Sequence, residues 1–168
     1  TKLERAARFI FLNRYCFNGL YRTNMQGKFN VPFGGNRSGT LPSQTDLINA
    51  SSTLKRATIV CGDFYEETLL HAQKDDYIYM DPPYAKINKT LDNQYGPSVF
   101  GTNDLRKLSD LLKKLNNLGA TFTVSYADCD EIQEIASQWT THTVQVRRVI
   151  AASTIKRGMA KEILITNF

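Results

Sequence analysis

Apolar positions at helical spacing open the chain. From Leu3 to Phe17 they recur every three or four residues, which predicts a helix that ends near Asn18-Gly19. Two short runs in which apolar and polar residues alternate come next, on either side of a corner at residues 24–27. Asn and Gly at that corner favour a tight turn, so this stretch predicts a β-hairpin or ribbon.

The pattern of apolar residues changes after this ribbon and the glycine-rich loop that follows it. The stretch from Ser43 to Asp46 has the form of a capping box and predicts a short helix through about Lys55. Compact apolar runs begin directly after it. We therefore expect two regions, residues 1–56 and residues 57–168.

Helices and strands alternate through the second region. Each apolar run is short, and polar or glycine-containing turns separate the runs. The predicted elements are a strand at 57–64 (ATIVCGDF), a helix at 65–74, a strand at 77–80 (YIYM), a helix at 102–118, a strand at 121–126, a helix at 130–139, and strands at 143–150 and 162–168. The alternation predicts an α/β sheet, mainly parallel, that ends in an antiparallel hairpin.

Composition narrows the class of protein. A chain of 168 residues is long enough for one compact domain, or for one domain and a small lobe. No apolar run approaches the ~20 residues of a bilayer span, so we expect a cytoplasmic protein without a membrane partner. Cys16, Cys61 and Cys129 are far apart and lack metal-ligand spacing, which predicts reduced thiols and no metal site. The net charge of +5 favours a polyanionic partner.

The tetrapeptide Asp81-Pro82-Pro83-Tyr84 follows the YIYM strand and carries the first chemical signal. Ligands of open α/β sheets bind beyond the carboxyl ends of the strands. Two prolines make a stiff segment whose carbonyl groups are free to accept hydrogen bonds, Asp81 adds a carboxylate acceptor, and Tyr84 offers a flat face for a planar ring. The alternative is a strand end closed by prolines, with Asp81 in a turn and Tyr84 in the core.

This motif resembles the catalytic motif of amino-methyltransferases that use S-adenosylmethionine, specifically the DNA adenine N6-methyltransferases. The resemblance implies that Asp81 and the Pro82 carbonyl hold the exocyclic amine, with Pro83 stiffening the loop and Tyr84 stacking on an adenine flipped out of the duplex. Methyl transfer is then an in-line displacement that needs no metal.

A longer signature is similar to Dam-type enzymes, the D12 class of adenine methyltransferases that act at GATC and related sites. It is NRYCFNGLYRTNMQGKFNVPFG, residues 13–34. The resemblance implies a target-recognition ribbon in the major groove, in which Arg22 reads a guanine. The implied DNA contacts are Arg14, Phe17, Asn18, Leu20, Arg22, Asn24, Asn30 and Pro32. The alternatives are a solvated hairpin, and Asn24 and Asn30 that only brace the turn.

Two further stretches are similar to the same family. In CGDF the resemblance implies that Asp63 and Phe64, together with Asp81, contact the cofactor, although Asp63 could equally be a helix N-cap. Towards the end of the chain, Arg148, Lys156 and Arg157 would contact phosphates, or lie in a basic turn that is merely solvated. The chain departs from the family pattern in two places. Tyr126 stands where many relatives have Asn, so no role of that Asn carries over to this chain. The loop at residues 35–37 lacks the Arg or aromatic residues of some relatives, which leaves the full recognition sequence open.

The family's glycine-rich F-x-G-x-G cofactor loop does not occur in this sequence. The resemblance covers essentially the whole chain but about the C-terminal two-thirds of a family member. It implies a class I, Rossmann-like methyltransferase sheet of strand order 3-2-1-4-5-7-6 that lacks its first two strands. Residues 1–56 would then be part of the target-recognition region, and residues 57–168 the C-terminal part of the catalytic domain.

Three functions follow as hypotheses. The first is a bacterial or phage adenine N6-methyltransferase, of the restriction-modification kind or otherwise, with S-adenosylmethionine as cofactor and double-stranded DNA as partner. In that case the absent N-terminal region, or a complementary subunit, is a further partner. The second is a DNA-binding fragment without catalysis, and the third an amino-methyltransferase acting on RNA or protein.

Overall fold

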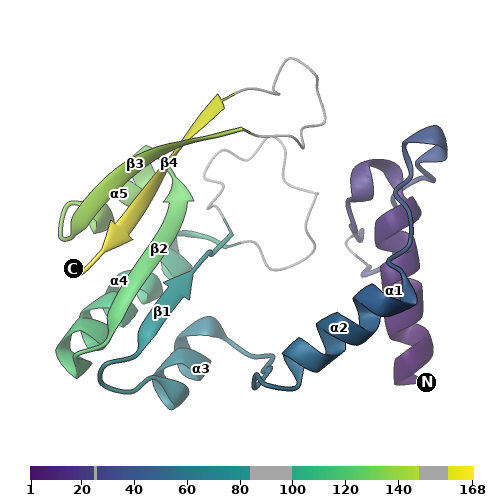
Figure 1. The fold of residues 1–168 in the computed structure, drawn as a ribbon. Helices are drawn as coiled ribbons and strands as arrows, with labels where there is room; N and C mark the ends of the chain where they lie inside the picture. Colours follow the sequence, from purple (N-terminus) through teal and green to yellow (C-terminus); the bar gives the residue numbers. More distant parts are fainter. Residues whose placement is uncertain (25, 84–99, 148–158) are drawn as a thin grey trace. The chain divides into compact units, whose positions relative to one another are not determined.

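The computed structural model describes residues 1–24, 26–83, 100–147 and 159–168. The chain divides into two compact units, one of them Thr1–Cys61 and the other beginning at Gly62 and ending at Phe168. Figure 1 shows the helices of the first unit and the sheet of the second. The expected boundary, after residue 56, lies slightly before this division.

The first unit opens with helix α1, Lys2–Tyr15, as the apolar spacing predicts. The backbone leaves the helix through a short 3-10 turn, Phe17–Gly19, in which Asn18 and Gly19 have φ angles of 56° and 65°. These left-handed conformations are easy for glycine and tolerable for asparagine. They turn the chain sharply from the helix into the ribbon.

The ribbon forms where the alternating pattern predicts it. Two isolated antiparallel bridges, Cys16 with Phe33 and Thr23 with Phe29, hold its two sides together. A short 3-10 turn, Gly35–Arg37, and helix α2, Gln44–Leu54, follow. The predicted capping box is present at the start of α2, because the side chains of Ser43 and Asp46 bond each other's backbone N–H groups.

The second unit is a sheet covered by helices. Its elements are α3 (Phe64–His71), β1 (Tyr77–Met80), α4 (Thr102–Leu118), β2 (Thr121–Ala127), α5 (Asp130–Ala136), β3 (Thr140–Arg147) and β4 (Met159–Thr166). The strand order is β1-β2-β4-β3. Strand β1 runs parallel to β2, whereas β4 is antiparallel to both β2 and β3. This order matches the 4-5-7-6 part of the order implied by the resemblance.

The core of this unit lies between α4, α5 and the sheet. Leucines at helical spacing on α4 are buried against β2 and β4, and Ile132 and Ile135 of α5 complete the cluster. Gly119 ends α4 at a φ angle of 83° and turns the chain directly into β2. None of the helices formed by the described residues combines the length and apolar character needed to cross a bilayer.

Two expectations about the sheet are wrong. Residues 57–63 form no strand, and Ile59 and Val60 are 71% and 51% exposed. An apolar, β-branched run forms a strand only where a neighbouring strand accepts its hydrogen bonds, and β1 is an edge strand of the described sheet. The sheet is also mixed instead of mainly parallel, because β4 inserts between β2 and β3.

Candidate functional site

The strand ladder places Asp81 at the carboxyl end of β1, beside β2. The pairing of Met80 with Val124 brings the next residues of the two strands, Asp81 and Ser125, side by side. The Ser125 hydroxyl donates a hydrogen bond of 3.0 Å to Oδ1 of Asp81. Ser125 is only 6% exposed, so it is a fixed donor that holds one oxygen of an exposed carboxylate.

A cavity of about 350 Å³ lies next to this carboxylate. Asp81, Pro82 and Pro83 line one part of it, and the rings of Phe64 and Phe100 line another. The two ring centroids are 5.9 Å apart and the ring planes meet at 44°. Largely apolar walls with one carboxylate suit a planar ligand that carries a hydrogen-bond donor. Tyr84 lies outside the described residues.

Asp63 begins α3 as its N-cap, which is the alternative that the sequence left open. Its Oδ1 accepts a 3.0 Å hydrogen bond from the Tyr65 N–H, and its Oδ2 lies 3.3 Å from Nζ of Lys107. Partial desolvation raises the pKa of Asp63, but the hydrogen bonds from Tyr65 and Lys107 outweigh it and leave the pKa below its ordinary value. Asp63 is therefore a charged cap that also fastens α3 to α4.

A second contact between these helices fixes the position of Phe64. The Tyr65 hydroxyl donates to Asp110 and accepts from Lys114, whose Nζ lies 3.0 Å from Oδ2 of Asp110. The hydrogen bond from Tyr65 is the main reason why the pKa of Asp110 is lowered. Residues on both sides of Phe64 are thus tied to α4, which holds the Phe64 ring against the cavity beside Asp81.

In the ribbon, a polar pair spans the two sides. Nε of Arg22 donates a hydrogen bond of 3.1 Å to Oδ1 of Asn30, and the Asn30 N–H donates to the Arg22 carbonyl at 3.2 Å. The Arg22 side chain is thus held by its inner nitrogen, which leaves the terminal nitrogens of the guanidinium group for a bidentate contact.

The side chain of Asn24 bonds to the backbone of the turn. Its Oδ1 accepts hydrogen bonds of 3.0 Å from the N–H groups of both Gln26 and Lys28. Of the two asparagines considered as turn braces, Asn24 braces the turn, whereas Asn30 holds Arg22.

The other ribbon candidates lie around the base of this hairpin. The Phe17 N–H donates to the Pro32 carbonyl at 2.8 Å, which sets these two residues next to each other. Phe17 is 40% exposed and Leu20 is partly buried. Arg14 lies in the last turn of α1 with an exposed side chain, and Asn18 occupies the sharp turn that follows. Arg148, Lys156 and Arg157 lie outside the described residues.

Sequence reasoning missed two residues of the Asp81 site. Ser125, like Thr123, is a buried polar residue of the strand TFTVSYA, and a buried hydroxyl in such a strand signals a specific partner. Phe100 follows a polar loop and precedes α4, and its sequence position alone gives no sign that its ring meets that of Phe64.

The comparisons with known proteins agree with this picture. The model of the D12 class N6 adenine-specific DNA methyltransferases matches residues 1–150. The type II methyltransferase M.MjaIII of Methanocaldococcus jannaschii is 34% identical over 170 residues, which is 99% of this chain and 58% of that protein. The DNA adenine methylase of Haemophilus influenzae is 34% identical over 163 residues, with 96% and 56% covered. That of Vibrio cholerae is 33% identical over 162 residues, with 95% and 58% covered.

The chain therefore spans somewhat more than half the length of these curated relatives. The match extends through both units, from α1 and the ribbon to the sheet that carries Asp81. The resemblance seen in the two sequence motifs is confirmed over most of the chain. This chain belongs to the family of D12 class N6 adenine-specific DNA methyltransferases.

Proposed function

We propose that this protein takes part in the transfer of a methyl group from S-adenosylmethionine to N6 of adenine in duplex DNA, at a GATC-like site, with the target base flipped out of the helix. In this proposal residues 1–56 belong to the target-recognition region and residues 57–168 to the catalytic domain. The observation that carries the proposal is the Asp81 carboxylate, held by Ser125 at the mouth of an aromatic-lined cavity.

The chemistry follows from which groups the loop offers. Asp81 and the carbonyl of Pro82 accept hydrogen bonds from the two N6 hydrogens, and Tyr84 stacks on the extruded ring. Hydrogen bonding from N6 turns its lone pair out towards the methyl carbon. Asp81 and the Pro82 carbonyl would thus orient N6 for attack on the methyl group that S-adenosylmethionine would supply, and the proton that N6 gives up would pass to solvent by way of the exposed Asp81 carboxylate.

Membership of the family implies a methyl donor, and the described residues fit one. When bound, S-adenosylmethionine supplies an electrophilic methyl group on a sulfonium centre. Phe64 and Asp81 share one cavity, so a donor held against the Phe64 ring would lie next to the amine acceptor. Asp63 could also accept hydrogen bonds from the donor, because each of its carboxylate oxygens has a lone pair beyond the one used by Tyr65 or Lys107.

Recognition of the DNA sequence is assigned to the ribbon. The Arg22 guanidinium, held by Asn30, would donate two hydrogen bonds to O6 and N7 of a guanine in the major groove. Leu20 and Pro32 would make apolar contacts to bases, Phe17 would lie close to the flipped adenine, and Asn18 would contact a phosphate or base. The basic residues Arg14, Arg148, Lys156 and Arg157 would neutralise phosphates.

The test is transfer of a radiolabelled methyl group to a GATC-containing duplex. It is run on the chain alone and on the chain joined to the N-terminal part of a full-length relative, with and without Asp81→Ala. We expect Asp81→Ala to abolish transfer while duplex affinity stays unchanged. Transfer that persists in Asp81→Ala would refute the role of this carboxylate.

The same experiment separates the remaining candidates. Duplex binding without transfer in either form supports a non-catalytic DNA-binding role. Competition by RNA that equals competition by duplex DNA would instead favour an amino-methyltransferase for another substrate. A duplex preference together with transfer supports the proposed function.

A further inference from the structure

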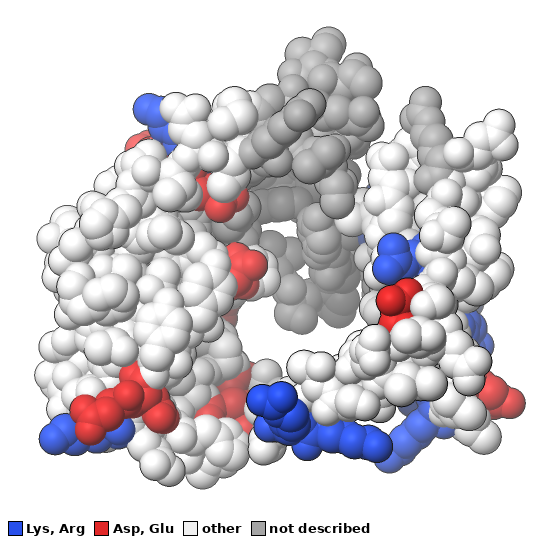
Figure 2. Space-filling view, viewed as in Figure 1, with Lys and Arg blue, Asp and Glu red and all other residues white. Residues whose placement is uncertain are grey.

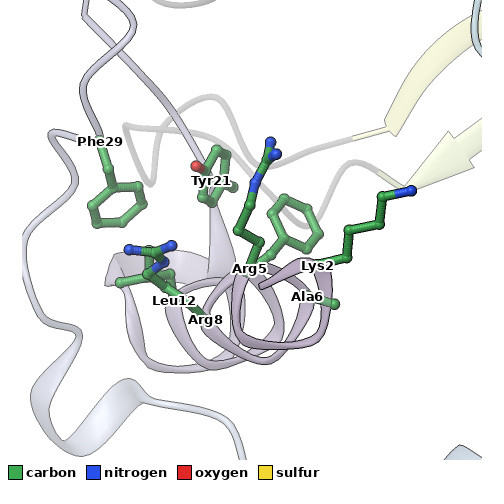
Figure 3. Close-up of a pocket in the computed structure, with 8 residues that line it drawn as sticks. Lys2, Arg5, Ala6, Arg8, Leu12, Tyr21 and Phe29 are labelled. Atoms are coloured by element: carbon green, nitrogen blue, oxygen red, sulfur yellow. The ribbon is translucent and has the colours of Figure 1, made fainter.

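A cavity of about 540 Å³ lies between α1 and the ribbon, within the first unit. Figure 3 shows Tyr21 and Phe29 extending from the ribbon towards α1, from which Arg5, Arg8 and Lys2 project. Phe9 of α1 and the two ribbon rings form a continuous row of tilted rings. The ring centroids of Phe9 and Tyr21 are 4.8 Å apart, and those of Tyr21 and Phe29 are 5.1 Å apart. The wall is therefore a continuous aromatic surface.

All charges that the described residues contribute to the lining of this cavity are positive. Lys2, Arg5 and Arg8 follow one another at intervals of three residues, which places them along one side of α1. Within the described part of the chain, no acidic group lies within ion-pair distance of these three side chains. On the face shown in Figure 2, Lys and Arg side chains of this unit gather around the beginning of α1 and the end of α2.

The cavity between α4 and α5 in the second unit provides a contrast. There Arg106 and Lys113 lie among Asp110, Glu131 and other carboxylates, so the positive charges are balanced locally. The α1 cavity has no such balance. Cations concentrated in a concave surface with apolar walls attract anions strongly, since the field there is less screened than on a flat surface.

We propose that Lys2, Arg5 and Arg8 form a binding site for the phosphodiester backbone of DNA, separate from the base-reading face of the ribbon. This inference rests on the proposed function. Tyr21 is a wall of the cavity and Arg22, the residue after it, is the candidate guanine reader. A ribbon seated in the major groove has a phosphate backbone on each side of it, and α1 packs directly on this ribbon. Sugars would pack on the aromatic wall while phosphates meet the cations.

The experiment measures duplex affinity by fluorescence anisotropy over a series of salt concentrations, with GATC-containing and scrambled duplexes. The test variant is Arg5→Gln/Arg8→Gln, since glutamine keeps the helix propensity of arginine. The matched control is Arg106→Gln/Lys113→Gln, which removes the same charge from the balanced cavity. Circular dichroism confirms that each variant is folded.

We expect the test variant to flatten the slope of log K against log salt by about 1 to 2, given a slope of about 0.9 for each phosphate contact. Affinity for both duplexes should fall by the same factor, whereas the control variant should match the unmodified chain. An unchanged slope, or an equal change in the control, overturns this inference alone. If the unmodified chain binds no duplex, the DNA-binding part of the proposed function fails as well.

Discussion

The contact between Arg22 and Asn30 leads to a quantitative prediction about base recognition. Asn30→Ala removes the acceptor that holds Nε of Arg22 at 3.1 Å, but leaves the guanidinium group itself. Without this acceptor the Arg22 side chain is free to move in the unbound protein, and it must then be ordered when DNA binds. Ordering a flexible side chain costs about 0.5 to 1.5 kcal/mol, which corresponds to a loss of about 2- to 12-fold in affinity for the correct base. If Arg22 has the proposed role, Arg22→Ala removes the bidentate contact to guanine itself, worth about 1 to 3 kcal/mol, or about 5- to 150-fold.

The assay compares affinity for a GATC-containing duplex with affinity for the same duplex in which 7-deazaguanine replaces guanine and so removes the N7 acceptor. The ratio of the two dissociation constants isolates the guanine contact from phosphate contacts. Asn24→Ala is the matched control, because Asn24 bonds the turn and not Arg22. It should change both dissociation constants by the same factor.

The double variant Arg22→Ala/Asn30→Ala should discriminate no less than Arg22→Ala alone, since Asn30 acts through Arg22. The reasoning is refuted if Asn30→Ala keeps the full ratio. If the ratio is kept while binding to both duplexes weakens by the same factor, Asn30 contacts a phosphate or stabilises the ribbon itself.

Three further predictions concern the second unit. Ser125→Ala should lower the rate of single-turnover methyl transfer by about 10- to 100-fold without changing duplex affinity. The Asp81 carboxylate would lose its fixed donor, and a misplacement of about 1 Å costs about 100-fold in rate. An unchanged rate would show that Asp81 needs no support from Ser125. The Leu111 side chain is fully buried, so Leu111→Ala should lower the free energy of unfolding, measured in urea, by about 2 to 5 kcal/mol. Leu118 on the same helix is 41% exposed and serves as the control. A smaller loss in Leu111→Ala than in Leu118→Ala would contradict the assigned core. Asp63→Asn keeps a side chain that can cap α3 but removes its charge. Because the fold lowers the pKa of Asp63, the ionised carboxylate stabilises the folded state at pH values above the ordinary carboxyl pKa. The melting temperature of the unmodified chain should therefore exceed that of Asp63→Asn at pH 7. The difference should begin to shrink as the pH falls below the ordinary carboxyl pKa of about 3.9, and it should vanish once the pH lies below the lowered pKa of Asp63 in the fold. A difference independent of pH would exclude this charge effect.

Much of the fold follows from local sequence signals. The helix at α1, the capping box at Ser43, the leucine spacing of α4 and the left-handed glycine that ends it are features of neighbouring residues, so the sequence alone predicts them. The strand that ends at Asp81 is predicted for the same reason, because the apolar run and the prolines after it are contiguous. The family signature lies in these contiguous motifs as well.

Strand pairing needs information that the local sequence lacks. Residues 57–63 have the composition of a buried strand and remain unpaired, since a strand depends on a neighbour as much as on its own residues. The mixed character of the sheet depends on where β4 inserts, which is a choice made between distant segments.

The candidate site shows the same division. That Asp81, Pro82 and Pro83 follow a strand and that Arg22 lies in a ribbon can be predicted from local sequence, because these features depend on residues that are close together along the chain. Tertiary packing is needed to show that Ser125 holds Asp81, that Asn30 holds Arg22, and that the rings of Phe100 and Phe64 meet. These partners lie on separate segments, and a hydrogen bond or ring contact between such segments exists only once the strands and helices have packed.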